Sequence, residues 1–158
     1  MKSIPITTRG YAALKQELEH KLKVERPRLV EQVAVARRVE SNPLESAELQ
    51  SALDAQKDNE TRIAELEDQL ARAEVIDPAR LSGSTIKFGA TVMLVDADTG
   101  EKKAFQIVGE PEADLRAGKI SCRSPIGRSL IGQEKGTSVE VITPKGPKTY
   151  EVKQLRWR

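Results

Sequence analysis

Few residues of this chain are able to do chemistry, and the most suggestive of them gather at one turn. His20 is the only histidine and Cys122 is the only cysteine. A single histidine excludes a histidine cluster and any Ser-His or Cys-His catalytic pair within one chain. A single cysteine excludes an internal disulfide and a cysteine-based zinc site. What remains is a polar group at the turn, formed by Glu40, Asn42 and Glu45.

The turn that carries this polar group joins two long amphipathic helices. Apolar residues recur at helical spacing from Tyr11 to Ala36, and a heptad-like series runs from Leu49 to Ala73. Antiparallel pairing brings both series together in one register. The pairs are Ala36–Leu49, Val33–Ala52, Leu29–Gln56, Leu22–Ile63, Leu18–Leu66, Leu14–Leu70 and Tyr11–Ala73. The pattern predicts a helical hairpin with arms on the order of 45–50 Å long.

Residues at the helix ends refine this prediction. Thr7 is a candidate N-cap for the first helix, which we expect to run to Val39 or Glu40. Pro27 interrupts the helix, and we expect one bent helix there, the alternative being two shorter helices.

The second helix has its own start signal. Asn42 fits the N-cap, Pro43 the first helical position and Glu45 the third position. Asn42 and Glu45 then match a capping box, which would give Glu45 a purely structural role. We expect this helix to end near Glu74.

Composition limits the function further. The chain has 158 residues, of which 32% are charged and 3% aromatic, with a net charge of +2. That charge is too small for a polybasic nucleic-acid footprint. The N-terminus lacks a signal-peptide apolar run, and there is no apolar stretch of 18 residues, so we expect a cytoplasmic protein without membrane contact.

After residue 77 the hydrophobic period changes from helical to strand-like. Residues 78–84 form a linker with Ser82, Gly83 and Ser84. Expected strands lie at residues 85–88, 91–95, 103–108, 120–123, 139–142 and 148–155. Ser124 and Pro125 open a short helix through Leu130. The fold class is therefore α+β, with a coiled-coil hairpin at 1–77 and a small antiparallel sheet domain with short helices at 85–158.

Ordered motifs are spread over nearly the whole chain. They are Ile4–Thr7 with Arg9–Gly10, Arg26–Pro27, Ala36–Arg37, Glu45–Glu48, Ala73–Asp77, Phe88–Val92, Ile107–Gly109, Glu112–Asp114 and Ser124–Gly132. In these motifs the chain resembles the Gre family of bacterial transcript cleavage factors, its GreA members more than its GreB members. The resemblance implies that residues 85–158 form an FKBP-like domain.

The resemblance also implies a function and a partner. The FKBP-like domain would dock on bacterial RNA polymerase at its secondary channel, and the coiled coil would reach the active centre. Acidic tip residues would help to hold a magnesium ion there while the polymerase hydrolyses backtracked RNA. Magnesium prefers carboxylate and water oxygens, which suits such a tip. The factor would be a monomer, would have no cofactor of its own, and would meet the nascent RNA 3′ end only indirectly.

The implied site residues follow from the matched positions. Glu45, with Glu40 and Asn42 as further candidates, would assist the metal. Independently of the matched positions, Arg37 and Arg38 are candidates to contact RNA phosphate or acidic residues of the polymerase. The polymerase-docking residues would be Ser124, Pro125, Ile126, Arg128 and Leu130. The implied role is that of an accessory factor and not of an enzyme. Prolyl isomerase activity is disfavoured because residues 78–158 offer few aromatic side chains for a pocket.

The tip departs from the family pattern, which reads roughly Gly-Asp-Leu-x-Glu-Asn-Ala-Glu-Tyr. Asn42 stands at the position of the family's tip aspartate, Pro43 follows it, and the chain before it is one residue longer. Asparagine offers a neutral oxygen and no charge. Two hypotheses stay open: a factor that stimulates cleavage, or a paralogue that regulates transcription by occupying the secondary channel without cleavage.

Overall fold

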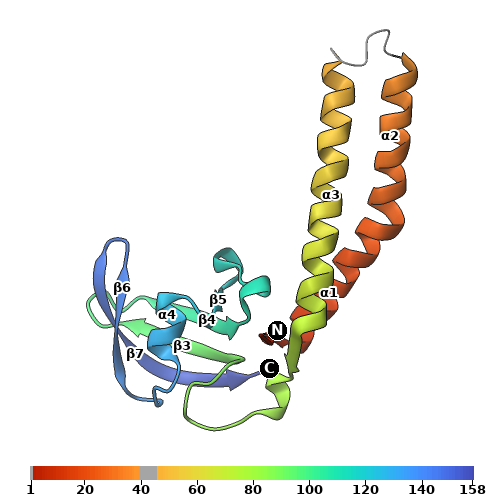
Figure 1. Ribbon diagram of the computed structural model, residues 1–158. Coiled ribbons are helices and arrows are strands. Elements are labelled where there is room, and N and C mark those ends of the chain that lie inside the picture. Colours follow the sequence, from red (N-terminus) through yellow and green to blue (C-terminus); the bar gives the residue numbers. More distant parts are fainter. Residues whose placement is uncertain (1, 40–45) are drawn as a thin grey trace. The chain divides into compact units, whose positions relative to one another are not determined.

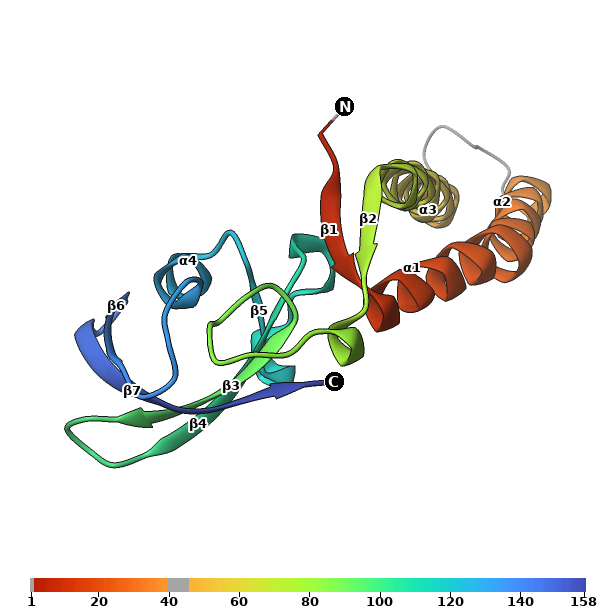
Figure 2. The same ribbon diagram turned by 90° about the horizontal axis from the view of Figure 1, so that it is seen from below.

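The structure, a computed structural model, describes residues 2–39 and 46–158 (Figures 1 and 2). The chain divides into two compact units: Ala12–Arg72, and Met1–Tyr11 together with Ala73–Arg158. The first unit is a helical hairpin and the second contains a curled sheet with short helices. The expected α+β class is confirmed. The limits predicted for the sequence domains, 1–77 and 85–158, stay a prediction.

The first arm of the hairpin is a continuous helix with a π-helical turn in its middle. It consists of α1 (Thr8–His20), the π-turn η1 (Lys21–Glu25) and α2 (Arg26–Val39). The N–H of Arg26 donates to the carbonyl of Lys21, five residues earlier, which defines a π-turn. Figure 1 shows that the helix axis changes direction between α1 and α2. The prediction of one bent helix near Pro27 is therefore confirmed.

The π-turn also resolves an irregularity in the predicted seam. Between Leu22 and Leu18 the first arm advances four residues, whereas the second advances three from Ile63 to Leu66. A π-turn holds an extra residue compared with an α-helical turn. The first arm thus accommodates its odd residue at η1, beside this step, and the apolar side chains on both sides of η1 stay on the seam.

The second arm, α3 (Ala47–Arg72), packs against the first through the predicted seam. Val33, Ala36 and Leu49 form a buried cluster, with Ala52 and Leu53 packed against it. This confirms the register at that end of the hairpin. Farther from the turn, the buried apolar residues are Leu14, Leu29, Ile63 and Leu66. Burial of each such side chain contributes about 1.5–3 kcal/mol.

A short parallel ribbon follows the hairpin. Strand β1 (Ile4–Thr7) pairs with β2 (Ala73–Ile76), with Ile4 opposite Ala73 and Thr7 opposite Ile76. The second helix therefore ends at Arg72, two residues earlier than predicted. The β-branched pair Val75–Ile76 favours an extended backbone, and β1 supplies the hydrogen-bonding partner that the sequence pattern did not reveal.

The main sheet has five strands in the order β5-β4-β3-β7-β6. Their bounds are β3 Ala90–Asp96, β4 Lys102–Val108, β5 Lys119–Ser121, β6 Ser138–Thr143 and β7 Gly146–Trp157. All neighbours are antiparallel except β4 and β5, which are parallel. The short helices are η2 Pro78–Arg80, η3 Glu110–Glu112, η4 Leu115–Ala117 and α4 Pro125–Leu130.

One predicted strand is absent and another is shorter. Of residues 85–88, Thr85 makes only an isolated bridge to Glu134, and Ile86 is buried in the core. The apolar side chain of Ile86 therefore packs in the core, and residues 85–88 do not form a hydrogen-bonded strand. Strand β5 ends at Ser121 because the chain turns there into the capped helix α4.

A single apolar core lies under this sheet. Strand β3 alternates, with Ala90, Val92 and Leu94 fully buried. The other buried core members are Ile86, Ile107, Ile120, Leu130, Val139, Val141, Tyr150 and Val152. In the described part of the chain, no helix is both long enough and apolar enough to cross a membrane.

Candidate functional site

The candidate site begins at the end of the hairpin. Glu40, Asn42 and Glu45 lie outside the described residues, so their roles at the tip stay predictions. The residues that flank them are described. They are Val39, the last residue of α2, and Ser46, which precedes α3.

Ser46 shows how α3 begins. Its side chain is buried, and its Oγ accepts a hydrogen bond of 3.0 Å from the backbone N–H of Leu49. Its carbonyl accepts from the N–H of Gln50 at 3.1 Å. Ser46 is therefore the N-cap and Leu49 occupies the third helical position.

The predicted start of this helix at Pro43 is therefore wrong. Ser46 supplies the cap that was assigned to Asn42, four residues further along the chain. Glu45 precedes the N-cap and cannot be the third helical residue of α3. The capping box consequently gives no structural explanation for this carboxylate.

Arg37 and Arg38 lie in the last turn of α2 and are exposed. Cationic side chains are favourable at this end of a helix because of its dipole. Nη2 of Arg38 pairs with Oε1 of Glu31 at 3.2 Å, with both side chains largely exposed. Arg37 has no ion-pair partner among residues 2–39 and 46–158. Contact of either residue with RNA phosphate stays a prediction, and Arg37 is the less engaged of the two.

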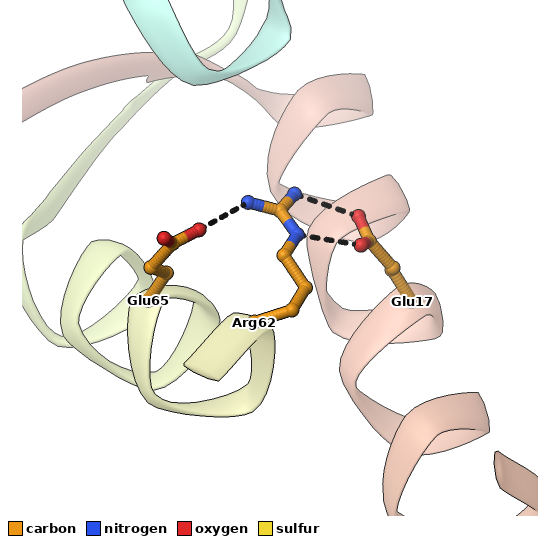
Figure 3. Close-up of polar contacts among 3 residues, drawn as sticks. All are labelled: Glu17, Arg62 and Glu65. Carbon is orange, nitrogen blue, oxygen red and sulfur yellow. Dashed lines mark hydrogen bonds and ion pairs between the residues drawn. The ribbon is translucent and has the colours of Figure 1, made fainter. Parts of the chain in front are cut away.

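Two ion pairs connect the arms on either side of the π-turn. Arg62 on α3 binds Glu17 on α1 with both carboxylate oxygens, and it also contacts Glu65 at 3.3 Å (Figure 3). The hydrogen bonds from Arg62 hold the pKa of the Glu17 carboxyl below its usual value. Arg26 and Glu60 form the second two-point pair, at 2.9 and 2.8 Å.

A buried amide strengthens the same region. Asn59 lies on the seam and is almost fully buried, and its Nδ2 donates to the carbonyl of Lys21 at 3.3 Å. This bond joins α3 directly to the backbone of η1. The heptad pattern placed Asn59 on the seam, but nothing in the sequence identified its partner.

The predicted docking residues are all in or beside α4. Ser124 is the N-cap, since its Oγ accepts from the N–H of Gly127 at 3.1 Å. Pro125 and Arg128 are exposed, whereas Ile126 packs partly against the core. Leu130 is fully buried and has no surface to offer a partner. Docking through Pro125 and Arg128 stays a prediction, while Ser124 and Leu130 shape and anchor the helix.

Sequence reasoning missed a carboxylate that organises the start of α1. Oε2 of Glu112 accepts from the backbone N–H of Thr7 at 2.8 Å and from that of Gly109 at 3.0 Å. Oε1 accepts from the hydroxyl of Thr7, which in turn accepts from the N–H of Gly10 at 3.1 Å. Thr7 is thus the N-cap, as predicted.

Glycine is required beside this carboxylate for reasons of space. A Cβ on Gly10 would lie 2.1 Å from Oε1 of Glu112, and one on Gly109 would lie 2.0 Å from the carbonyl oxygen of Pro5. The sequence contained one signal, the motif at residues 112–114. Its partner lies 105 residues away, so a single sequence could not reveal the contact.

Among the described residues, no group of three or more His, Cys, Asp or Glu side chains is placed to hold a metal ion. His20 lies 4.0 Å from Glu25 and belongs to no larger cluster of this kind. The tip carboxylates stay the predicted magnesium ligands, and they lie outside the described residues.

Comparison with known proteins agrees with these features. The family model described as "Transcription elongation factor, N-terminal" matches residues 4–75, and the model "Transcription elongation factor, GreA/GreB, C-term" matches residues 81–156.

Full-length relatives give the same result. "Transcription elongation factor GreA" of Methylobacterium nodulans is 55% identical over 96% of both chains. The proteins of that name from Methylobacterium sp. (strain 4-46) and Rhodopseudomonas palustris (strain TIE-1) are each 52% identical. They cover 99% and 100% of this chain and 99% of their own lengths. The chain therefore belongs to the GreA/GreB family of transcription elongation factors.

Proposed function

We propose that this protein binds bacterial RNA polymerase in its secondary channel and stimulates the polymerase to cleave backtracked transcripts. The observation that carries the proposal is the match of both family models, which together span residues 4–156. The GreA relatives are matched over almost their whole length, so both the arm and the sheet unit are accounted for. The factor would act as an accessory and leave catalysis to the polymerase.

Glu45 is the residue most suited to act at the polymerase active centre. Ser46 caps α3, so the Asn42–Glu45 capping box is not the start of that helix. A carboxylate there would supply an oxygen ligand to the polymerase's magnesium ion, and Glu40 and Asn42 are the other candidate oxygen donors. The metal would supply water activation and charge stabilisation when bound. Arg37 and Arg38 would stabilise the phosphate groups of the RNA 3′ end.

Docking would fall to the sheet unit. Pro125 and Arg128 are exposed on α4, and Leu130 and the cap at Ser124 hold that helix on the core. An exposed cation beside a proline offers a charged contact on a rigid backbone. We expect the protein to act as a monomer in the cytoplasm.

The experiment is RNA cleavage in a stalled, backtracked elongation complex with and without the protein. We expect strong stimulation that Glu45→Ala abolishes. Glu48→Ala is the matched control, because Glu48 is an exposed carboxylate one turn further along, within α3. Equal loss from both variants would contradict a specific role for Glu45.

A second candidate function rests on the tip sequence. Asn42 replaces the aspartate usual in the family and Pro43 follows it, which weakens the expected metal ligand set. A channel-occupying regulator would give no cleavage but would compete with an active cleavage factor for the polymerase. Absence of both cleavage and competition would refute both functions.

A further inference from the structure

A small, partly open pocket in the sheet unit has no part in the proposed function. Its volume is about 250 Å³, and its lining includes the buried residues Thr7 and Pro78. Three cationic side chains from separate parts of the chain line it: Arg9 from the first turn of α1, Lys119 from β5 and Arg158 after β7. We call this the basic pocket. All of its lining residues belong to one compact unit.

The three cations line one pocket, and none of them is neutralised by a described ion pair. Arg9, Lys119 and Arg158 have no ion-pair partner within residues 2–39 and 46–158. Asp77 also lines the pocket, but its Oδ1 accepts from the N–H of Ala79 at 3.1 Å and its Oδ2 faces Arg80 at 3.6 Å. The lining side chains thus carry three positive charges and one negative charge, and this excess of positive charge would attract an anionic ligand.

Neutral hydrogen-bond donors complete the lining. Thr8 and Gln106 make only long bonds, of 3.5 Å to the carbonyl of Ile76 and 3.4 Å to that of Gly89. The hydroxyl of Thr7 is already committed to Glu112. The positive end of the α1 dipole adds to the field of the three cations. The pocket therefore offers cations and weakly engaged donors to one ligand.

We propose that the basic pocket binds the phosphate group of a small molecule. Guanidinium and ammonium groups together recognise tetrahedral oxyanions by charge-assisted hydrogen bonds. The volume accommodates a phosphate or diphosphate group. A nucleic-acid backbone would need a longer basic stripe than one cavity of this size provides. This inference goes beyond the proposed function and is tested on the free protein, so either one can fail without the other.

The test is calorimetric titration of the full chain with inorganic phosphate, pyrophosphate and a nucleoside triphosphate, without divalent metal and at matched ionic strength. We expect saturable binding of one equivalent, weakened about tenfold or more by Arg9→Gln or Lys119→Gln, because each removes a charge-assisted hydrogen bond. Lys145→Gln and Arg116→Gln are the matched controls. They remove the same charge from exposed residues outside the pocket. Both should bind like the wild type.

Mapping the phosphate site by NMR makes the test independent of variant stability, because it uses the wild-type protein. In the wild-type protein, phosphate should shift the NMR signals of the Gln106 side-chain amide and of the Thr8 backbone amide. The three ligands distinguish the source of the group: equal affinity for all three indicates a free phosphate site, and tighter nucleotide binding indicates a nucleotide site. Non-saturable binding, equal weakening by the control variants, or binding of an RNA oligonucleotide alone would overturn the proposal.

Discussion

Arg62 holds Glu17 across the two arms of the hairpin by two nearly parallel hydrogen bonds, of 2.7 and 2.9 Å (Figure 3). Two-point binding of a carboxylate by a guanidinium fixes direction as well as distance. The pair therefore fixes the rotational setting of α1 against α3 at one point, in addition to the apolar seam.

This pair predicts a pH-dependent effect on stability. Because both side chains are about one-third exposed, Glu17→Gln should lower the free energy of unfolding by about 0.5–1 kcal/mol at pH 7. The folded-state pKa of Glu17 lies below the ordinary value of 4.5 for a glutamate carboxyl, because Arg62 donates hydrogen bonds to it. Its contribution is thus fully present above pH 4.5 and is lost as the pH falls through the folded-state pKa. Urea unfolding at pH 7 and pH 3 should show a larger difference at pH 7 than at pH 3. A difference of the same size at both values would contradict this role for the carboxylate.

The start of α3 gives a second prediction. Ser46→Ala should lower stability by about 1 kcal/mol, because the N–H of Leu49 loses its acceptor. Asn42→Ala, the control at the cap position inferred from the sequence, should leave stability unchanged. Thermal unfolding followed by circular dichroism measures both variants. A larger effect of the Asn42 substitution would restore the original assignment of the cap.

The carboxylate at Glu112 gives a third prediction. Glu112→Ala leaves the N–H groups of Thr7 and Gly109 without their acceptor, which should cost roughly 2–3 kcal/mol. Glu110→Ala is the matched control, since Glu110 is exposed and lies 4.0 Å from its ion partner Arg123. For a chain of this length, the Glu112 variant should melt about 5–10 °C lower. Equal melting temperatures for the two variants would exclude the role inferred for Glu112.

A fourth prediction separates core packing from docking in the α4 segment. Leu130→Ala should cost about 2–5 kcal/mol, because it leaves a cavity in the core. Ile131→Ala changes a neighbour that is 38% exposed and should cost much less. Any loss of polymerase binding by the Leu130 variant should then follow its loss of folded protein. Impaired binding by fully folded Leu130→Ala protein would instead place Leu130 in the interface.

Patterns that repeat along the chain were the most predictable part of this fold. The seam through Val33, Ala36 and Leu49 follows from spacing alone, because a heptad has only one buried face. The strands β3 and β4 and the capped helix α4 follow from local composition in the same way. Each of these features depends on residues close together in the sequence.

Contacts between distant residues could not be predicted. Ile4 pairs with Ala73, and Thr7 binds Glu112, although the paired positions are 69 and 105 residues apart in the sequence. A single sequence contains no signal for such pairs. The start of α3 was predicted wrongly for a different reason. Both Asn42 and Ser46 are residue types that favour the N-cap, and propensity does not choose between them. The docking set was predicted from motifs, which do not distinguish a buried Leu130 from an exposed Arg128.

The π-turn at Lys21–Glu25 adds a residue to the first arm without changing which side of α2 faces α3. Each residue of an α-helix rotates the chain by about 100° and advances it by about 1.5 Å. An odd residue inserted without compensation would turn Arg37 and Arg38 about a quarter of a turn away from their present side. Because η1 holds the odd residue, Arg37 and Arg38 stay on the side of α2 that they would occupy without it.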